Sequence, residues 1–364
     1  MVWHQEMVQE KIREKAKELL AKKEVDLVIG FGEGSLPLRA TPIFVRTPEE
    51  ADRLVWNSFC DNNLATYIHK LSRFKLGIVA KGCDARSITA LGLEKRFQPD
   101  RIVLIGVPCQ RMVDRRKVKL TAQRAGLLGN VDMMTRSALT PLRESVTALP
   151  AYKAGHPADL PVKKTVRGEI LRAREEGDQL IVEGNDFSVS LKKDDFLYTS
   201  CRTCTHRNPV KANVVVADQV DETPLTDPYA EAKEFEKMSP EERWNTFEKE
   251  SNRCIRCYAC REACPMCYCA ECFVDSSGPK WLEKGLAPSD LQFYHIVRAY
   301  HQTGRCTGCG ACERACPMTI RLTYMTQKLN QEVKDLFDFE AGTDPETLPP
   351  MATYKAEDKQ EFIK

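Results

Sequence analysis

The sequence predicts an α/β unit with a small parallel or mixed sheet, followed by a smaller, cysteine-rich α+β unit. Residues 75–95 read as a strand, a turn and a helix, and residues 100–113 begin with a second apolar strand. Two strands that enclose a helix are typical of a βαβ crossover, in which the strands are parallel. The spacing C-x2-C-x2-C-x3-C-P then occurs twice, at 254–265 and 306–317. A chain of 364 residues also favours two domains.

The composition excludes several classes of protein. Lysine and arginine number 54 against 52 aspartates and glutamates, a net charge of +2, so nothing indicates binding of nucleic acid. No apolar run approaches the ~18 residues of a membrane span, and the charged stretch 1–15 lacks a signal-peptide core. We therefore expect a cytoplasmic protein. Disulfides are rare in that reducing compartment, so metal ligation best explains the 16 cysteines.

The chain is expected to open with a helix and two strands. Residues 5–23 are rich in helix formers, 25–31 read as a short buried strand, and 41–47 read as another. A further helix is expected to start at Thr47, which can cap it, with Pro48 in the first turn. The apolar stripe of the first helix comprises Met7, Ile12, Ala16 and Leu19.

Three glycines, Gly30, Gly32 and Gly34, follow the first strand and superficially resemble a phosphate-binding loop. They do not fit G-x-G-x-x-G, and no helix-opening pattern comes before Pro37. We interpret them as a plain turn.

The two strands of the βαβ unit each lead to a cysteine. Cys83 follows the first and Cys109 ends the second. Parallel strands place their carboxyl ends at one edge of the sheet, which is where open α/β sheets bind ligands. The flanking residues would suit an anionic cofactor, or they could simply be solvated. They are Lys81, Arg86, Gln110 and Arg111.

The middle of the chain is less regular. Residues 114–165 are poorly patterned, and their proline-rich part is expected to form a surface excursion or to contact a partner. Residues 179–191 read as a hairpin about a Gly-Asn-Asp turn. The pair Cys201-x2-Cys204, before a strand at 213–217, could be half a zinc site, a redox dithiol or half a cluster.

The repeated cysteine motif has the spacing that wraps a cubic 4Fe–4S cluster. Three cysteines on a tight loop bind one cluster and the fourth binds the other. A pair of zinc sites is the alternative, but structural zinc prefers ligands in two pairs. Pro265 and Pro317 would each end a short helix. Residues 254–320 thus resemble a bacterial-type two-cluster ferredoxin. One cluster is assigned to Cys254, Cys257, Cys260 and Cys316, the other to Cys306, Cys309, Cys312 and Cys264.

The segment between the motifs holds a helix at 289–304. Its face formed by Phe293, Ile296, Val297 and Tyr300 is expected to pack over the clusters. His295 and His301 are interpreted as surface or core residues, because cysteines already supply enough ligands. The chain is accordingly divided into a first domain at 1–220, a linker and lead-in helix at 221–250, a two-cluster domain at 251–328 with its insert at 273–305, and a partner-contacting tail at 329–364.

Three short stretches of the first domain, VAKGCDARSI, IGVPCQ and CRTC followed by KANVVVAD, resemble the β subunit of the deazaflavin-reducing hydrogenase and of related formate dehydrogenases. That resemblance implies a flavoprotein domain with a third 4Fe–4S cluster on Cys83, Cys109, Cys201 and Cys204. It also implies FAD beside this cluster. The loop 56–68 is similar to the family's flavin-side loop, and the implied FAD contacts are Asn62, Asn63, Lys81, Gly82 and Arg86.

Four cysteines remain unassigned after three clusters: Cys60, Cys267, Cys269 and Cys272. Sixteen cysteines divide evenly into four cubane sites, so a fourth cluster on these residues is one interpretation. Buried structural thiols and a mononuclear metal site are the others.

The function expected from these features is electron transfer in a multisubunit anaerobic oxidoreductase. FAD would exchange a hydride with a soluble carrier, either a deazaflavin coenzyme or NAD(P)H, and the clusters would carry single electrons. By resemblance, the partner is a formate dehydrogenase or hydrogenase catalytic subunit, or a heterodisulfide-reductase-like assembly. The alternative is a non-catalytic adaptor without a working flavin site, which is favoured by the absence here of the family's glycine-rich opening.

Overall fold

The computed structural model describes residues 5–128, 169–283 and 285–350. A five-stranded mixed sheet in the order β2-β1-β3-β4-β8 forms the framework of the first half. β2 is antiparallel to β1, and the remaining neighbours are parallel. The strands are β1 (Leu27–Glu33), β2 (Ala40–Val45), β3 (Leu76–Ala80), β4 (Ile102–Gly106) and β8 (Val214–Val215).

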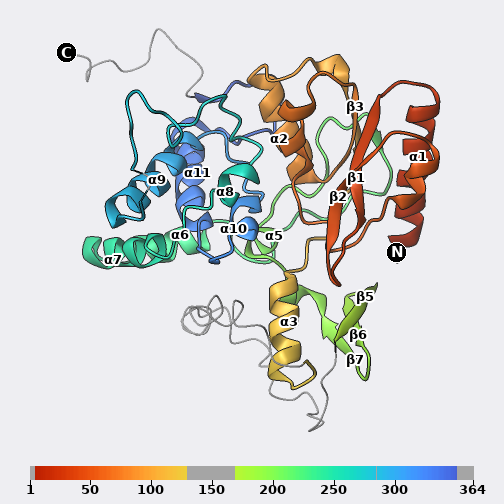
Figure 1. Ribbon diagram of the computed structural model, residues 1–364, viewed down its shortest axis with the longest axis horizontal. Coiled ribbons are helices and arrows are strands. Elements are labelled where there is room, and N and C mark those ends of the chain that lie inside the picture. Colours follow the sequence, from red (N-terminus) through yellow and green to blue (C-terminus); the bar gives the residue numbers. More distant parts are fainter. Residues whose placement is uncertain (1–4, 129–168, 284, 351–364) are drawn as a thin grey trace.

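Helices cover both faces of this sheet, which explains why β3 is a continuous apolar run. Helix α1 (Gln5–Ala21) lies on one face and α2 (Gly82–Leu93) on the other (Figure 1). All five residues of β3 are buried. The predicted parallel βαβ unit is confirmed, with β3 pairing in register with β4.

Two local predictions in this half need correction. Met7 is 54% exposed, and Val8 takes its place in the buried stripe of α1. The helix expected from Thr47 is only a short 3-10 turn, η1 (Glu49–Arg53), in which Pro48 occupies the cap position without a side-chain hydrogen bond. The other 3-10 turns are η2 (Leu64–Tyr67), η3 (His69–Leu71), η4 (Pro99–Arg101) and η7 (Lys193–Phe196).

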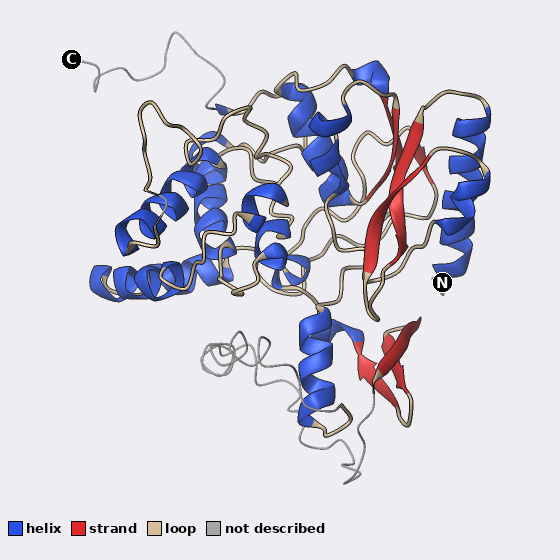
Figure 2. Cartoon of the chain, in the orientation of Figure 1, coloured by secondary structure: helices blue, strands red, loops and turns tan. Residues whose placement is uncertain are grey.

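A second, three-stranded sheet projects from the framework together with α3 (Arg115–Arg124) (Figure 2). Its strands β6 and β7 are the predicted hairpin, which is confirmed. Strand β5 and helix α3 were not predicted. Residues 129–168, where most of the expected surface excursion falls, lie outside the described residues. The strands are β5 (Ile170–Glu176), β6 (Gln179–Gly184) and β7 (Ser188–Lys192).

The second half of the chain forms a helical lobe beside the first sheet (Figure 1). Its contact with the framework includes Glu94 at the end of α2, which accepts hydrogen bonds from both Tyr268 and Arg305. The helices are α5 (Thr199–Arg202), α6 (Ala230–Glu236), α7 (Pro240–Ser251), α8 (Ala259–Glu262), α9 (Pro288–His301), α10 (Ala311–Ala315) and α11 (Thr323–Phe337).

Helix α9 exists as predicted but buries a different face. Phe293 is 40% exposed and Tyr300 is 65% exposed, so the expected packing face is wrong. The buried face comprises Leu291, Tyr294, His295, Arg298 and Ala299.

After α11 the chain returns to the first domain. Both Nε and Nη2 of Arg86 donate to the carbonyl of Ala341, at 3.0 and 2.8 Å. Gly342 has a φ of +72°, and a Cβ there would lie 2.0 Å from the carbonyl oxygen of Arg86. Residues 338–342 therefore form a strap against α2, and residues 351–364 lie outside the described part of the chain.

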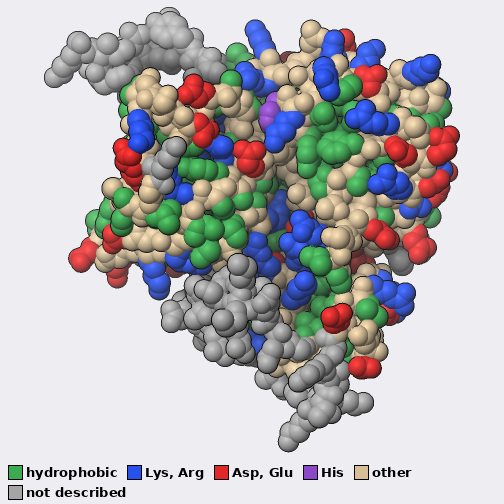
Figure 3. Space-filling view, in the orientation of Figure 1, with side chains coloured by type: hydrophobic (Ala, Val, Ile, Leu, Met, Phe, Trp, Pro, Cys, Tyr) green, Lys and Arg blue, Asp and Glu red, His purple; other side chains and the backbone are tan. Residues whose placement is uncertain are grey.

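Lys and Arg side chains gather in the central crease of one face, between the helical lobe and the two sheets (Figure 3). Arg116 of α3 connects the projecting unit to the helical lobe, because its Nη2 donates to the carbonyl of Cys316, 3.3 Å away. Within the described residues, no helix is both long enough and apolar enough to cross a membrane.

Candidate iron–sulfur centres

The two cysteine motifs share an unusual backbone. The second residue after the first cysteine has a positive φ in both, 52° at Arg256 and 68° at Gly308. The fourth residue does so too, 57° at Tyr258 and 69° at Gly310, and a short helix starts directly after it in each case. The left-handed region costs a non-glycine residue free energy, so other contacts must hold Arg256 and Tyr258 in this shape. Arg256 Nη1 donates to the carbonyl of Gly285 at 2.6 Å, and its Nη2 donates to Tyr258 Oη at 2.8 Å.

The same loops aim backbone N–H groups at sulfur. The N–H of Arg256 donates to Cys254 Sγ and that of Gly308 donates to Cys306 Sγ, each at 3.4 Å. Cys316 Sγ accepts from the N–H of Ile320 at 3.5 Å. Thiolates that ligate iron–sulfur clusters accept such bonds, which help to set the cluster potential. The residues present therefore fit a 4Fe–4S group.

The motif cysteines gather in the crossed pattern that the spacing predicts. Cys254 interacts electrostatically with Cys260, Cys316 and Cys257, and Cys312 interacts with Cys264, Cys306 and Cys309. The structure thus brings Cys316 to the first motif and Cys264 to the second. We call these groups the Cys254 set (Cys254, Cys257, Cys260, Cys316) and the Cys306 set (Cys306, Cys309, Cys312, Cys264).

A third group of cysteines meets at the carboxyl edge of the first sheet. Cys83 lies in the first turn of α2 and Cys109 lies just beyond β4, while Cys201 is in α5. Burial, followed by the nearby Cys201 and Cys204, raises the pKa of Cys109 to about 12. The Cys83 set (Cys83, Cys109, Cys201, Cys204) lines a single cavity.

Protein hydrogen bonds fix this third group. The N–H of Cys109 donates to the carbonyl of Arg207 at 3.0 Å, and Arg207 Nε donates back to the carbonyl of Cys109 at 2.8 Å. A Cβ on Gly82 would lie 2.4 Å from the carbonyl oxygen of His206. The start of α2 therefore packs directly on the segment that carries Cys204.

The Cys83 set and the Cys306 set are neighbours. Cys309 lines the same cavity as the Cys83 set, and Cys83 interacts electrostatically with it. Arg314 lies at the same junction, where its Nη1 donates to the carbonyl of Cys309 at 2.6 Å and its charge interacts with Cys201. Three cysteine sets thus follow one another through the molecule.

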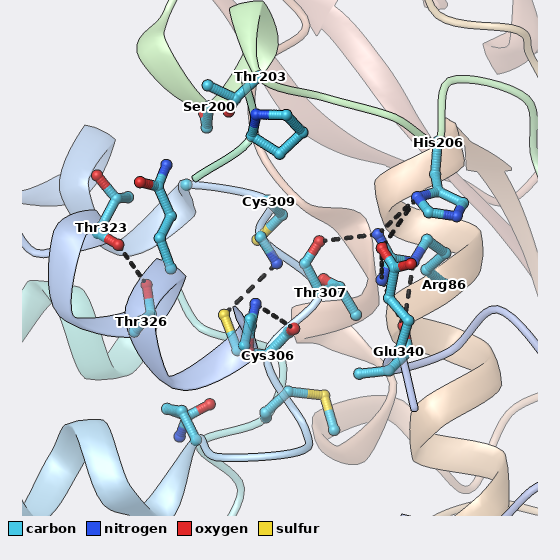
Figure 4. A pocket seen from close by; sticks show the side chains of 18 of the residues that line it. Arg86, Ser200, Thr203, His206, Cys306, Thr307, Cys309, Thr323, Thr326 and Glu340 are labelled. Atoms are coloured by element: carbon cyan, nitrogen blue, oxygen red, sulfur yellow. Dashed lines mark hydrogen bonds and ion pairs between the residues drawn. The ribbon is translucent and has the colours of Figure 1, made fainter. Parts of the chain in front are cut away.

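A hollow of about 460 Å³ opens beside the Cys306 set (Figure 4). Arg86 lies on its wall, where Nη1 is 3.2 Å from His206 Nδ1 and Nη2 is 3.5 Å from Glu340 Oε1. Burial, together with the charge of Arg86, lowers the pKa of His206. The strap of residues 338–342 closes one side of this hollow.

The residues expected to contact FAD are already engaged by the protein. Lys81 is 1% exposed, pairs with Asp84 at 2.8 Å and donates to the carbonyl of Asn62 at 2.8 Å. Asn63 donates to Ser87 Oγ at 3.0 Å. Arg86 is bound by the strap, Gly82 packs against backbone, and Asn62 is exposed. Lys81 and Arg86 also border the cavity of the Cys83 set, and contacts of these five residues with FAD stay a prediction.

The four remaining cysteines have different surroundings. The buried thiol of Cys60 contacts Asn57 Oδ1, at 3.7 Å, and the Val55 carbonyl, both in the first domain. Cys267 lies against Cys264, Cys272 interacts with Arg261, and Cys269 is exposed. In the described residues no three Cys, His, Asp or Glu side chains converge on a single metal ion, either at these four cysteines or at the three sets above. A fourth cluster stays a prediction, and the distance of Cys60 from the other three does not favour it.

Sequence reasoning missed the polar residues that surround the clusters' sites. Tyr294 Oη lies 3.2 Å from Cys260 Sγ, and Gln302 Nε2 donates to Cys267 Sγ at 3.4 Å. Arg298 is 6% exposed. All three come from α9 or its end. Their spacing of four residues, at 294, 298 and 302, was the available signal.

Comparison with known proteins first defines the class of the C-terminal unit. Residues 250–320 match the family model of the 4Fe-4S dicluster domain, which confirms the ferredoxin-type prediction. The matched residues contain the whole Cys254 and Cys306 sets.

Comparison of the whole chain then indicates more particular relatives. It is 26% identical over 368 residues to the F420-dependent formate dehydrogenase subunit beta of Methanocaldococcus jannaschii, covering 92% of both proteins. It is 22% identical over 387 residues to the F420-dependent formate dehydrogenase 1 subunit beta of Methanococcus maripaludis, covering 92% of this chain and 91% of that one. The resemblance to formate dehydrogenase beta subunits is confirmed.

Among solved structures, a chain of the F420-reducing [NiFe] hydrogenase complex from Methanosarcina barkeri is 12% identical. The match covers 54% of this chain and 63% of that one, with a TM-score of 0.35. A similarity of this size carries no argument about either fold or function.

Proposed function

We propose that this chain is the electron-transfer subunit of a multisubunit oxidoreductase of the formate dehydrogenase type. One observation carries the proposal: the Cys83 set shares a cavity with Cys309 of the Cys306 set. The Cys306 set in turn exchanges a cysteine with the Cys254 set. 4Fe–4S clusters held on these sets would take up and release electrons one at a time.

The protein shields one cysteine set from solvent and leaves another accessible at the surface. Cys109 is buried, and Cys83 and Cys204 are partly buried. Burial is the main cause of the raised pKa of each of these thiols. By contrast, Cys257 of the Cys254 set is exposed. The chain thus offers a buried station at the sheet edge and a surface station in the ferredoxin unit, where a partner could exchange electrons.

The names of the relatives suggest the partner and the carrier. Both are subunits of F420-dependent formate dehydrogenases, so we propose a formate dehydrogenase catalytic subunit as partner and a deazaflavin coenzyme as carrier. The alternative carrier is NAD(P)H. The alternative partners are a hydrogenase catalytic subunit and a heterodisulfide-reductase-like assembly. Either carrier delivers a hydride, which is two electrons, so direct exchange with one-electron clusters requires a flavin to divide the pair.

The adaptor alternative gains support from the occupied side chains. Lys81, Asn63 and Arg86 all donate hydrogen bonds to other protein groups. If no flavin binds elsewhere, the chain would pass electrons between subunits without meeting the hydride carrier. The cysteine relay is common to both proposals.

Flavin released by acid from the anaerobically purified protein distinguishes the two proposals. Stoichiometric FAD supports the flavin-bearing subunit, whereas protein loaded with iron but free of flavin supports the adaptor. An iron-free protein that is fully folded would contradict both.

A further inference from the structure

Arg298 is a buried cation without an acidic partner. Its side chain belongs to α9, in the insert between the two cysteine motifs, and is 6% exposed. Nη2 donates to the carbonyl of Cys260 at 3.1 Å, while Nε is buried and has no hydrogen-bond partner. Throughout the described residues, no carboxylate oxygen lies within ion-pair distance of its guanidinium. An isolated buried charge is strongly unfavourable unless something compensates it.

The compensation has to come from sulfur. The strongest charge interactions of Arg298 are with Cys312, Cys264, Cys260 and Cys267. Cys260 belongs to the Cys254 set, whereas Cys264 and Cys312 belong to the Cys306 set. The guanidinium therefore lies where the two sets approach each other.

Three other arginines of the same unit are neutralised by carboxylates. Arg305, next to Cys306, binds Glu94 with Nη2 and Oε2 2.9 Å apart. Arg253 binds Glu250 at 3.0 Å and Arg321 binds Glu231 at 3.1 Å. Arg298 differs from them in this respect. Its environment is complete only when the cysteines carry negative charge.

We propose that Arg298 supplies the positive charge shared by the two clusters of the ferredoxin unit, and that it makes both easier to reduce. A cluster held by four thiolates is anionic, and each added electron increases that charge. A fixed cation between two such groups stabilises the reduced form of both, since cluster potentials respond to net charge and to hydrogen bonds at sulfur. The free Nε–H is a donor suited to a sulfur acceptor.

This inference rests on the proposed ligand sets and goes beyond them. It gives the insert helix α9 a purpose in addition to packing, namely to bring a cation between the motifs. It also explains why the buried face of α9 contains a charged residue, whereas Phe293 and Tyr300 face outward.

The test compares Arg298→Gln and Arg298→Lys in the full-length protein, purified anaerobically with its clusters. EPR-monitored redox titration gives the midpoint potentials of the ferredoxin pair. Arg298→Gln is expected to lower the equilibrium constant for reduction of both clusters at least tenfold, which is about 59 mV for one electron. Arg298→Lys keeps a charge and should shift the potentials by less than half as much.

Arg305→Gln combined with Glu94→Gln is the matched control, because it removes an arginine next to Cys306 together with the carboxylate that balances it. It should shift the potentials far less than Arg298→Gln. Two results would overturn the inference. One is an equilibrium constant for cluster reduction in Arg298→Gln that stays within twofold of the wild-type value. The other is an equal shift of the midpoint potentials in the Gln and Lys variants.

Cluster content resolves the remaining outcomes. Loss of both clusters in Arg298→Gln but not in Arg298→Lys supports the need for a charge, and loss in both variants overturns it in favour of packing. The wild-type protein separates this inference from the proposed function. If wild type lacks the coupled cluster pair, the ligand assignment fails, whereas unchanged potentials in a loaded variant refute only the role of Arg298.

Discussion

Arg256 and Tyr258 hold backbone conformations that the second motif assigns to glycine. Cysteine spacing predicted which thiols gather, and the structure brings those thiols together. Spacing could not predict that a tyrosine would adopt a left-handed conformation, because local preference opposes it. Cysteine spacing also could not predict that Arg298 is buried. A buried arginine needs negative charge around it, and the sequence does not show which cysteines lie near position 298.

Cys83 allows the third cluster to be tested alone. Cys83→Ser removes one thiolate from the Cys83 set and leaves the other two sets untouched. Iron content should fall by about a third, from roughly 12 to roughly 8 atoms per chain on cubane stoichiometry. The EPR coupling of the ferredoxin pair should persist, and its loss would refute the division into three sets.

His295 makes stability depend on pH. Burial, followed by the charge of Arg298, lowers the pKa of His295 to about 4 from an ordinary value of 6.5. The folded protein keeps this ring neutral while the unfolded chain binds a proton below pH 6.5, so stability falls as the pH drops from 6.5 towards 4. The full effect is about 3 kcal/mol.

Thermal unfolding between pH 7.5 and 5 measures this effect. His295→Phe should flatten the decline, whereas His301→Gln, at an exposed site on the same helix, should leave it unchanged. Identical pH profiles for wild type and His295→Phe would show that another group titrates.

At the scale of elements, the start of α2 positions the third cluster's site. Gly82→Ala would force a Cβ to within 2.4 Å of the carbonyl oxygen of His206. Because this contact is with backbone, α2 must move, and Cys83 moves with it. We expect loss of the third cluster, measured as about 4 fewer iron atoms, with the ferredoxin pair intact.

Gly92→Ala is the control on the same helix. A Cβ there would meet Phe97 Cζ at 3.5 Å, an ordinary contact. Alanine in a helix is more stable than glycine by up to about 1 kcal/mol, so this variant should keep all its iron. Equal iron loss in both variants would mean that helix propensity, not the contact at Gly82, is responsible.

The strap at 338–342 is expected to release when Gly342 is replaced. Gly342→Ala places a Cβ 2.0 Å from the carbonyl oxygen of Arg86, whereas Gly177→Ala meets nothing within 4 Å. Both glycines have positive φ, so both variants carry the same left-handed penalty of about 1–2 kcal/mol. Hydrogen exchange at residues 338–350 should accelerate only in Gly342→Ala, and equal protection in wild type and Gly342→Ala would exclude the strap.

Elements with a buried apolar run were predictable, and elements with charged surfaces were not. β3 and β4 are continuous apolar segments, and their pairing followed from the βαβ pattern. β5 reads ILRAREE, in which Arg172, Arg174 and Glu176 are exposed and the partly buried Glu175 is also charged, so its sequence alone does not suggest a strand. The periodicity of the sequence predicted helix α9. The face predicted to be buried was wrong, because the buried face carries polar residues that lie against the cysteines.

Across the whole molecule, the cysteine sets run from the buried sheet edge to the exposed Cys257. Each cysteine set could be predicted from the sequence, but the proximity of Cys83 to Cys309 could not. These residues are far apart in the chain, and only the docking of the helical lobe on the first sheet brings them together. The hydrogen bonds from Arg86 to the strap could not be predicted from the sequence either, because they form only when the helical lobe docks on the first sheet.

The measurement that tests this arrangement most directly is iron and acid-labile sulfide per chain in anaerobically purified wild-type protein. Three occupied sets predict about 12 iron atoms and about 12 sulfides. About 8 of each would mean that only the ferredoxin unit binds clusters, and would contradict the three-set relay.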